Sequence, residues 1–547
     1  MRRRFSWLGR ALAAVFLFQA VAPGARADEI PSFLPNGDFS TVSGTPPWPT
    51  GWTNEAEGQV TREDDNGTPF LRLASLAPGQ LVKVSAEAPL PPGAKGVAYD
   101  VRFRVTGLRM GTAFTHDAHT YFQFLDADGQ PVKTGDGGAV FDSHAKEWTP
   151  LHRAFLVPDG AARLRIAFAL NEPDAGTLDI AAPRLSLLPD AETQAMVQAP
   201  IVAARKEADD QAEVQRLLAL PSKSVILKVA GNKIVAPDGT PVRLQGVNVE
   251  SLEWSAKGEN VLRSAKVAFV DWKANAIRLP VNDDFWFGRG RAPQTTSNDA
   301  DAYRALVDDV VKLAAGQGGY VVLDLHKYHA PTDAHAAFWM DAAARYKDNP
   351  AVLFDLFNEP GGISWDQWKN GGDIADKPKN GMTPPVWRSP GMQALLDAAR
   401  STGAKNIVLA GGLGNSYDLS GIAQGFALED KTGNGIVYAV HFYNWHKNWM
   451  KHFLFLADQY PLFVGECGAD VKKMPFVPAN QQEDPATWVP DALGMIQKYG
   501  LSWTAFSLHP KSTPVLISDW SYTPTPFWGV PVQEALGGKV FPSAALR

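Results

Sequence analysis

The chain has 547 residues, of which 45% are apolar and 20% charged, and its formal net charge at pH 7 is −6. This length exceeds what one ordinary hydrophobic core holds, so two or three domains are expected. The mild negative charge argues against nucleic acid or an anionic membrane surface as a partner. The single cysteine, Cys467, excludes an intrachain disulfide.

Residues 1–27 have the three parts of a secretory signal peptide. Arginines follow Met1, an apolar stretch runs from 11 to 22, and Ala25-Arg26-Ala27 forms an Ala-x-Ala cleavage motif. The apolar stretch is too short to span a bilayer. We therefore expect a secreted or periplasmic protein that has no membrane association after cleavage. The arginines fit both an ordinary signal and a twin-arginine signal.

Residues 28–190 have the pattern of an all-β domain. Runs such as 96–105 and 162–170 alternate apolar and polar side chains, and turn sequences such as Pro158-Asp159-Gly160 separate such runs. This pattern predicts a β-sandwich. The opening, 34–39, and the final strand, 178–187, resemble those of jelly-roll carbohydrate-binding modules. A sandwich that only packs on its neighbour, or binds something else, is the alternative.

Residues 191–224 form a predicted helical connector, and 225–547 a second domain. Ala, Glu, Gln and Arg dominate the connector, with apolar residues at helical spacing. In the second domain strands and amphipathic helices alternate, which predicts an α/β fold, a (β/α)8 TIM barrel. A doubly wound open sheet is the alternative, but no Gly-rich phosphate loop follows an early strand. The eight candidate strands are 242–249, 276–281, 320–326, 351–359, 406–411, 437–443, 462–466 and 502–508.

Two of the predicted barrel strands deliver a glutamate at their carboxyl end. Asn358 and Glu359 follow a long apolar run, and Glu466 ends a shorter one. Active sites of such barrels lie at the carboxyl ends of the strands, and the fourth and seventh strands face each other across the barrel mouth. Two facing carboxyl groups suit glycosidic bond cleavage, because one protonates the leaving oxygen while the other meets the charge at the anomeric carbon.

Other strand ends carry further polar or aromatic side chains. A cation near the second carboxylate would stabilise its anion, and Arg278 is the obvious donor, with Tyr443 able to add a hydrogen bond. The complete set resembles the site of glycoside hydrolase family 5, over essentially all of 225–546. It comprises Arg278, His326, Asn358, Glu359, His441, Tyr443, Glu466 and Trp503.

The family resemblance implies a role for each of these residues. Glu359 would be the acid/base and Glu466 the nucleophile of a retaining mechanism, with the carboxyl groups roughly 5–5.5 Å apart. The substrate-binding roles would be contact with the sugar 2-hydroxyl (Asn358), a place beside the acid/base (His441), binding of the glycon (His326) and the floor under the sugar (Trp503).

These patterns predict a secreted retaining β-glycoside hydrolase that acts on a polysaccharide or oligosaccharide. An endo-β-1,4-glucanase is the first expectation; a β-mannanase, another β-glucan hydrolase or an exo-acting glucosidase is the second. A non-catalytic extracellular carbohydrate-binding protein is the alternative of another class, which the intact glutamates argue against. We expect a monomer with no cofactor. We also expect no metal site, since His326 and His329 lack a matching carboxylate pattern.

Overall fold

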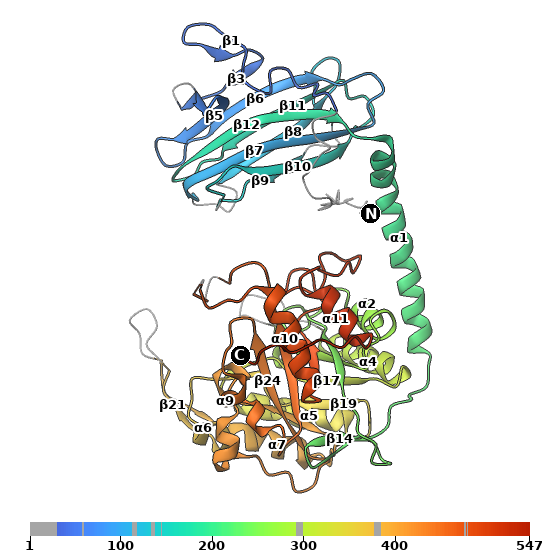
Figure 1. Ribbon diagram of the computed structural model, residues 1–547. Helices are drawn as coiled ribbons and strands as arrows, with labels where there is room; N and C mark the ends of the chain where they lie inside the picture. The colour runs from blue at the N-terminus through green and yellow to red at the C-terminus, as the bar shows by residue number, and fades with distance from the viewer. Residues whose placement is uncertain are drawn as a thin grey trace, which may run out of the picture. The chain divides into compact units, whose positions relative to one another are not determined.

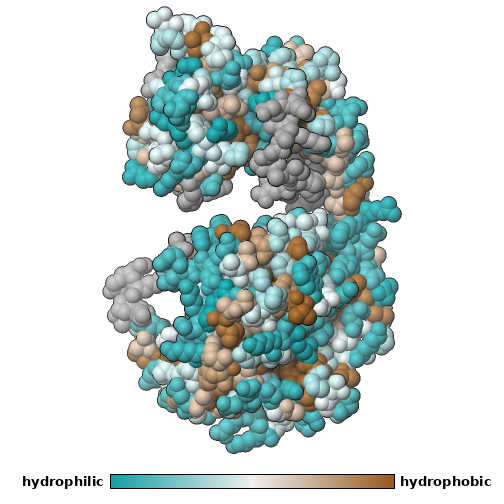
Figure 2. Space-filling model, in the orientation of Figure 1, coloured by the Kyte–Doolittle hydropathy of each residue, from teal (hydrophilic) through white to brown (hydrophobic). Residues whose placement is uncertain are grey.

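The computed structural model describes residues 30–547 except 57–58, 112–116, 133–136, 144, 291–298, 377–383, 475–476 and 479. The predicted signal peptide lies outside the described residues. The chain divides into two compact units, Met1–Ala203 and Ala204–Arg547 (Figure 1). Hydrophilic residues predominate on the face that Figure 2 shows, with apolar residues scattered among them. None of the helices in the described part of the chain combines the length and apolar character needed to cross a lipid bilayer.

The first unit is an all-β sandwich, which confirms the prediction for this part of the chain. Its antiparallel sheets have the strand orders β10-β7-β12-β5-β4 and β3-β6-β11-β8-β9. Aromatic and branched side chains of both sheets form one core. The strands are β1 (Val42–Ser43), β2 (Trp48–Pro49), β3 (Trp52–Asn54), β4 (Val60–Asp65), β5 (Thr68–Ser75), β6 (Val82–Pro89), β7 (Gly96–Arg109), β8 (Ala118–Leu125), β9 (Gly137–Val140), β10 (Thr149–Leu156), β11 (Arg163–Leu170) and β12 (Ala175–Leu187).

Helix α1 (Asp190–Leu218) occupies most of the predicted helical connector. Its last turns belong to the second unit, where Val214 and Leu217 are buried in the core. The carboxylate of Asp210 accepts hydrogen bonds from Arg263 Nε (2.8 Å) and Lys266 Nζ (2.9 Å). These buried contacts fix the end of the helix on the second unit.

The second unit is a closed barrel of eight parallel strands, as the sequence predicts. The strands, in order around the barrel, are β15 (Gln245–Asn248), β16 (Ala276–Val281), β17 (Tyr320–Leu325), β19 (Val352–Asp355), β23 (Val408–Gly411), β24 (Ile436–Tyr443), β25 (Leu462–Gly468) and β26 (Ser502–Ala505). A hairpin, β13 (Lys228–Ala230) and β14 (Lys233–Val235), closes one end, where Leu227 and Ile234 join the inner apolar layer of the barrel.

Helices surround the barrel and bury their apolar faces on its outer side (Figure 1). Helix α4 begins where the side chain of Asp299 accepts a hydrogen bond from the Ala302 amide (3.0 Å), an N-cap that satisfies a free amide of the first turn. The helices are α2 (Val261–Lys266), α3 (Asp283–Trp286), α4 (Ala300–Gly316), α5 (Asp333–Tyr346), α6 (Trp365–Asn370), α7 (Gly391–Ser401), α8 (Leu413–Ser416), α9 (Trp449–His452), α10 (Pro485–Lys498) and α11 (Gly529–Leu536).

Short strand pairs extend the barrel at its carboxyl end. The predicted fourth strand, 351–359, is shorter in the structure, because β19 stops at Asp355. Glu359 belongs instead to β20 (Glu359–Pro360), which pairs with β18 (Tyr328–His329) just above the barrel ladder. A second pair, β21 (Gly372–Ile374) and β22 (Trp387–Ser389), follows in the same region of the sequence. Glu359 is therefore held by backbone pairing on the rim.

Candidate active site

The two glutamates converge at the carboxyl end of the barrel. Glu466 lies in β25 and is buried, and Glu359 lies in β20, with 14% of its side chain exposed. One carboxyl oxygen of each, together with a ring nitrogen of His441, all lie within 4.8 Å of one another. So close an approach of two carboxyl oxygens fits a retaining pair, whose carboxyl groups are typically about 5–5.5 Å apart, better than an inverting pair, which needs roughly 6.5–9.5 Å for its water.

A fully buried guanidinium, that of Arg278, binds the Glu466 carboxylate. Arg278, in β16, donates to Glu466 Oε1 (2.8 Å), Asp355 Oδ2 (2.9 Å) and Asn358 Oδ1 (2.8 Å). Burial alone would lower its pKa, but the carboxylates of Asp324, Asp355 and Glu466 hold the pKa of Arg278 well above its ordinary value. Arg278 is thus a permanent positive charge beside the candidate nucleophile.

Glu466 is ionised at neutral pH. Burial by itself would raise its pKa, but the nearby ring of His441, the guanidinium of Arg278 and the hydroxyl of Tyr443 lower the pKa of Glu466 to about 2. The Tyr443 hydroxyl donates directly to Oε2, and His441 Nδ1 lies 3.6 Å from the same oxygen. The ring of Trp445 stacks on that of Tyr443 (centroids 4.8 Å apart, planes at 7°), which fixes the tyrosine. A charged carboxylate of this kind is suited to nucleophilic attack.

Glu359 has a different environment. His441 Nδ1 lies 3.1 Å from Glu359 Oε1, and the amide of Asn415 donates to Oε2 (3.0 Å). No guanidinium contacts Glu359 among the described residues. One carboxyl group is therefore bound to a fixed cation while the other has polar neighbours and access to solvent, which is the asymmetry that an acid and a nucleophile require.

Two further predicted residues lie beside this pair. The Oδ1 atom of Asn358 accepts from Arg278, while its buried Nδ2 has no hydrogen-bond partner among the described residues. His326 Nδ1 contacts Asp324 Oδ2 (2.7 Å), and its Nε2 contacts the Tyr328 hydroxyl (3.0 Å). Burial would lower the pKa of His326, but the bond to Asp324 raises it to about 9. Asn358 Nδ2 is a donor left for a ligand, and His326 is a cation at neutral pH.

Trp503 does not reach the site, which corrects its expected place beneath the sugar. It is 1% exposed and lies in the core between the barrel and its helices. On the neighbouring strand β25 it pairs with Val464, which also lies in the core between the barrel and its helices. The preceding pair is Ser502 with Phe463, and Phe463 belongs to the core inside the barrel. Because alternate residues of a strand face opposite sides, Trp503 faces away from the barrel interior.

The aromatic side chain at the end of β26 that does reach the site is Phe506. Its amide donates to the carbonyl of Cys467 (2.9 Å), directly after Glu466. Its half-buried ring lies 6.2 Å from that of Tyr443, at 80°. The family resemblance places the floor at Trp503, but the aromatic side chain that reaches the site follows the end of β26, at Phe506. Cys467 itself is buried and packs in the core.

Sequence reasoning also missed four polar residues of the site. Asn248 Oδ1 accepts a hydrogen bond from Arg278 (3.1 Å), and the carboxylates of Asp324 and Asp355 form ion pairs with Arg278. A polar residue inside an apolar strand run was the available signal for these three. Asn415 follows β23 in a left-handed turn (φ 59°), and nothing in its local pattern points to Glu359.

The cluster of Glu359, His441 and Glu466 has metal-ligand atom types, but its charges do not suit a divalent cation. Glu466 already binds Arg278 through one oxygen and Tyr443 through the other. A divalent ion at this point would lie close to a buried guanidinium, and like charges repel strongly where water is excluded. The arrangement is suited to acid–base and nucleophilic chemistry.

Removing the Tyr443 hydroxyl tests the account of Glu466. In Tyr443→Phe the carboxylate loses a hydrogen bond that favours its ionised form, so the pKa of Glu466 rises above about 2. Activity requires the ionised form, so the acid limb of the kcat/KM profile should move to higher pH. The control is Tyr438→Phe, which removes a buried hydroxyl from the same strand, bonded to the Leu428 amide. An acid limb that stays in place in Tyr443→Phe would contradict the account.

The family model "Cellulase (glycosyl hydrolase family 5)" matches residues 235–512, which is half of the chain. Similar proteins include Endoglucanase E-5 of Thermobifida fusca (23% identity, covering 45% of this chain and 48% of the relative) and Endoglucanase N of Pectobacterium atrosepticum (26%, 52% and 58%). The chain thus spans about half the length of these relatives. A solved structure of a β-glucanase from Saccharophagus degradans with cellotetraose is also similar (23% identity, TM-score 0.46, covering 58% of this chain and 94% of that one).

The fold, the paired glutamates and the family match agree. The chain belongs to glycosyl hydrolase family 5.

Proposed function

We propose that this protein is a retaining endo-β-1,4-glucanase that works by double displacement through Glu359 and Glu466. The observation that carries the proposal is the separation of the two carboxyl groups, whose nearest ligand atoms lie within 4.8 Å of each other. At this distance a sugar fits between them, and Glu466 can attack the anomeric carbon directly. Of the six other predicted site residues, five lie around the two glutamates and support the proposal. Trp503 lies in the core and does not support it.

In the first step, Glu466 forms a bond to the anomeric carbon while the glycosidic bond breaks. Glu359 gives its proton to the departing oxygen, so the shortened chain leaves as an alcohol and a glycosyl ester remains on Glu466. In the second step Glu359, now a carboxylate, takes a proton from water. The resulting hydroxide equivalent attacks the anomeric carbon and releases Glu466.

The neighbouring residues supply what these steps need. Arg278 and Tyr443 hold the Glu466 carboxylate in one orientation, so little rearrangement precedes attack. The free amide donor of Asn358 supports its proposed contact with the sugar 2-hydroxyl, where a hydrogen bond that strengthens in the transition state lowers the barrier. His441, between the glutamates, positions Glu359. The half-buried ring of Phe506 offers the apolar surface that was expected of Trp503.

The proposed substrate is a β-1,4-glucan, and the two similar proteins named above, both called endoglucanases, support this choice. A β-mannanase or another β-glucan hydrolase would use the same two glutamates, and closed loops at one end of the site would make the enzyme exo-acting. Reducing-end release from cellulose, mixed-linkage β-glucan, mannan and xyloglucan separates these cases. Highest kcat/KM on a β-1,4-glucan is expected, and preference for mannan would replace the proposed substrate.

We also propose that the protein is exported and acts as a monomer. The signal-like segment 1–27 supports export. The all-β unit then acts as a carbohydrate-binding module that binds the same substrate. Its sandwich architecture and the resemblance of its opening, 34–39, and of its final strand support this role. A purely binding function for the whole chain is disfavoured, because the two glutamates, Arg278 and Tyr443 remain in contact.

A further inference from the structure

The outer face of the second sheet of the sandwich is hollowed into a trough, which lies in the first unit alone. The strand register places a row of side chains side by side across four strands; the first two, Thr53 and Ser85, line the hollow, and the next two continue the row. Thr53 in β3 pairs with Ser85 in β6, which pairs with Ala167 in β11, which pairs with Tyr121 in β8. The first three are small, so the row is low over three strands and rises at the tyrosine.

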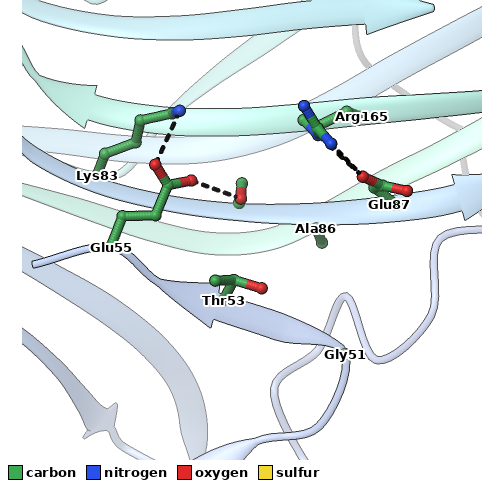
Figure 3. A pocket seen from close by; sticks show the side chains of 8 residues that line it. Gly51, Thr53, Glu55, Lys83, Ala86, Glu87 and Arg165 are labelled. Atoms are coloured by element: carbon green, nitrogen blue, oxygen red, sulfur yellow. Dashed lines mark hydrogen bonds and ion pairs between the residues drawn. The ribbon is translucent and has the colours of Figure 1, made fainter. Parts of the chain in front are cut away.

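Two ion pairs form the long walls of the trough (Figure 3). On one side Lys83 Nζ lies 3.0 Å from Glu55 Oε2, while Ser85 donates to the other oxygen of Glu55 (2.9 Å). On the other side Arg165 Nη2 lies 2.6 Å from Glu87 Oε1. These residues, with Gly51 and Thr53, line a cavity of about 450 Å³. This volume is within the range of small-molecule sites.

The charges of the walls indicate the class of ligand. Glu55 and Glu87 carry two negative charges, and Lys83 and Arg165 carry two positive charges, so the lining is neutral overall. An anion or a cation would meet as much repulsion as attraction. A hydroxyl group both donates and accepts, so a polyhydroxylated ligand can bond to the carboxylates and the cations of both walls at once.

The aromatic end of the row fits the same ligand. Tyr121 is 36% exposed, and the ring of His119 lies parallel to it, with centroids 5.5 Å apart and planes at 16°. The ring of Tyr121 thus offers an apolar surface to one face of a sugar beside the polar trough. Three strand spacings of about 4.8 Å give the row a length of roughly 14 Å, enough for a short oligosaccharide.

We propose that this trough binds a segment of the β-1,4-glucan chain, lying across the strands from Thr53 to Tyr121. The identity of the glycan rests on the function proposed for the barrel, whereas the neutral, polyhydroxylated class follows from the trough alone. The trough binds the polymer without cleaving it. Cleavage would need two available carboxyl groups, and both glutamates of the lining already form ion pairs with a lysine or an arginine.

Calorimetric titration of the full chain with cellohexaose tests the proposal, with Glu466→Gln present throughout to stop hydrolysis. The parent should bind two molecules, one in the barrel and one in the trough. Adding Arg165→Ala, which empties one wall, or Tyr121→Ala, which removes the aromatic end, should each leave one. The matched control is Arg102→Ala, an exposed arginine in the opposite sheet, which should retain two. Thermal melts establish that each variant is folded.

The outcomes separate the trough from the barrel. Two sites that persist in both Arg165→Ala and Tyr121→Ala, or a single site in the parent that neither change removes, would overturn the trough. A single site in the parent that either change abolishes would support the trough and count against the barrel as a β-1,4-glucanase. With Glu466 restored, Arg165→Ala should hydrolyse a soluble glucan at the parent rate, while its adsorption to insoluble cellulose falls at least about fivefold, which corresponds to roughly 1 kcal/mol.

Discussion

Replacing Glu466 by glutamine is expected to lower kcat on a soluble β-glucan by roughly 10⁴- to 10⁶-fold, the scale on which a covalent nucleophile is lost. Glutamine has nearly the shape of glutamate, so the pocket stays filled, but it carries no negative charge and cannot form the glycosyl ester. Such a loss corresponds to roughly 5–8 kcal/mol of transition-state stabilisation. Oligosaccharide affinity should change far less, because the hydrogen bonds that bind the sugar elsewhere remain.

The matched control is Glu429→Gln, which makes the same chemical change at an exposed glutamate of the barrel unit. It should keep parental activity. Residual turnover of more than about 1% in Glu466→Gln would mean that another group is the nucleophile, since the substituted amide cannot take its place. A second test uses Glu466→Gly with sodium azide, where the small anion enters from the face that the carboxylate occupied and yields the α-glycosyl azide.

Replacing Glu359 by alanine should have an effect that depends on the leaving group. General acid catalysis contributes typically about 10²- to 10⁴-fold, so hydrolysis of a glucan should fall by that factor. An aryl glycoside with an acidic phenol needs no proton to depart, so formation of the glycosyl-enzyme should proceed at nearly the parent rate. Breakdown of the intermediate then becomes slow, because no base activates water, and a burst of phenol should appear.

Azide should restore the second step in Glu359→Ala and give the β-glycosyl azide, because it attacks from the face that water uses. The control is Asn415→Ala, which removes the amide that binds Glu359 Oε2 but leaves the carboxyl group in place. It should show a smaller loss that is similar for both substrates. Equal losses on glucan and aryl glycoside in Glu359→Ala would show that this residue does not protonate the leaving group.

Much of the barrel could be predicted from sequence because its strands are buried on both faces and end in polar residues. The eight predicted strands all occur, and Glu359, Glu466, Arg278, His441 and Tyr443 meet at one end. Trp503 was misplaced because residue type does not tell which face of a strand a side chain occupies; the ladder register, which pairs Trp503 with Val464, places it on the outer face. The predicted fourth strand is interrupted in the structure: β19 stops at Asp355, and Glu359 and Pro360 form β20, which pairs with β18.

Other features depend on contacts between segments far apart in the sequence. Asn415 reaches Glu359 across 56 residues from a left-handed turn, and no local pattern anticipates this. In the sandwich, alternation predicted strands, but the trough exists only because the register aligns Thr53, Ser85 and Ala167 as one low row. A shift of one residue would have sent these side chains to the core face. Such features follow from register rather than from composition.

The most direct test of the central claim, that two carboxyl groups less than about 5.5 Å apart act on one sugar in turn, is the stereochemistry of hydrolysis. Proton NMR can follow the anomeric signals of cellopentaose products during the first minutes, before mutarotation mixes them. The account predicts that the β-anomer appears first at the newly formed reducing end and the α-anomer only later. Initial formation of the α-anomer would contradict it, because a single displacement by water inverts the anomeric carbon.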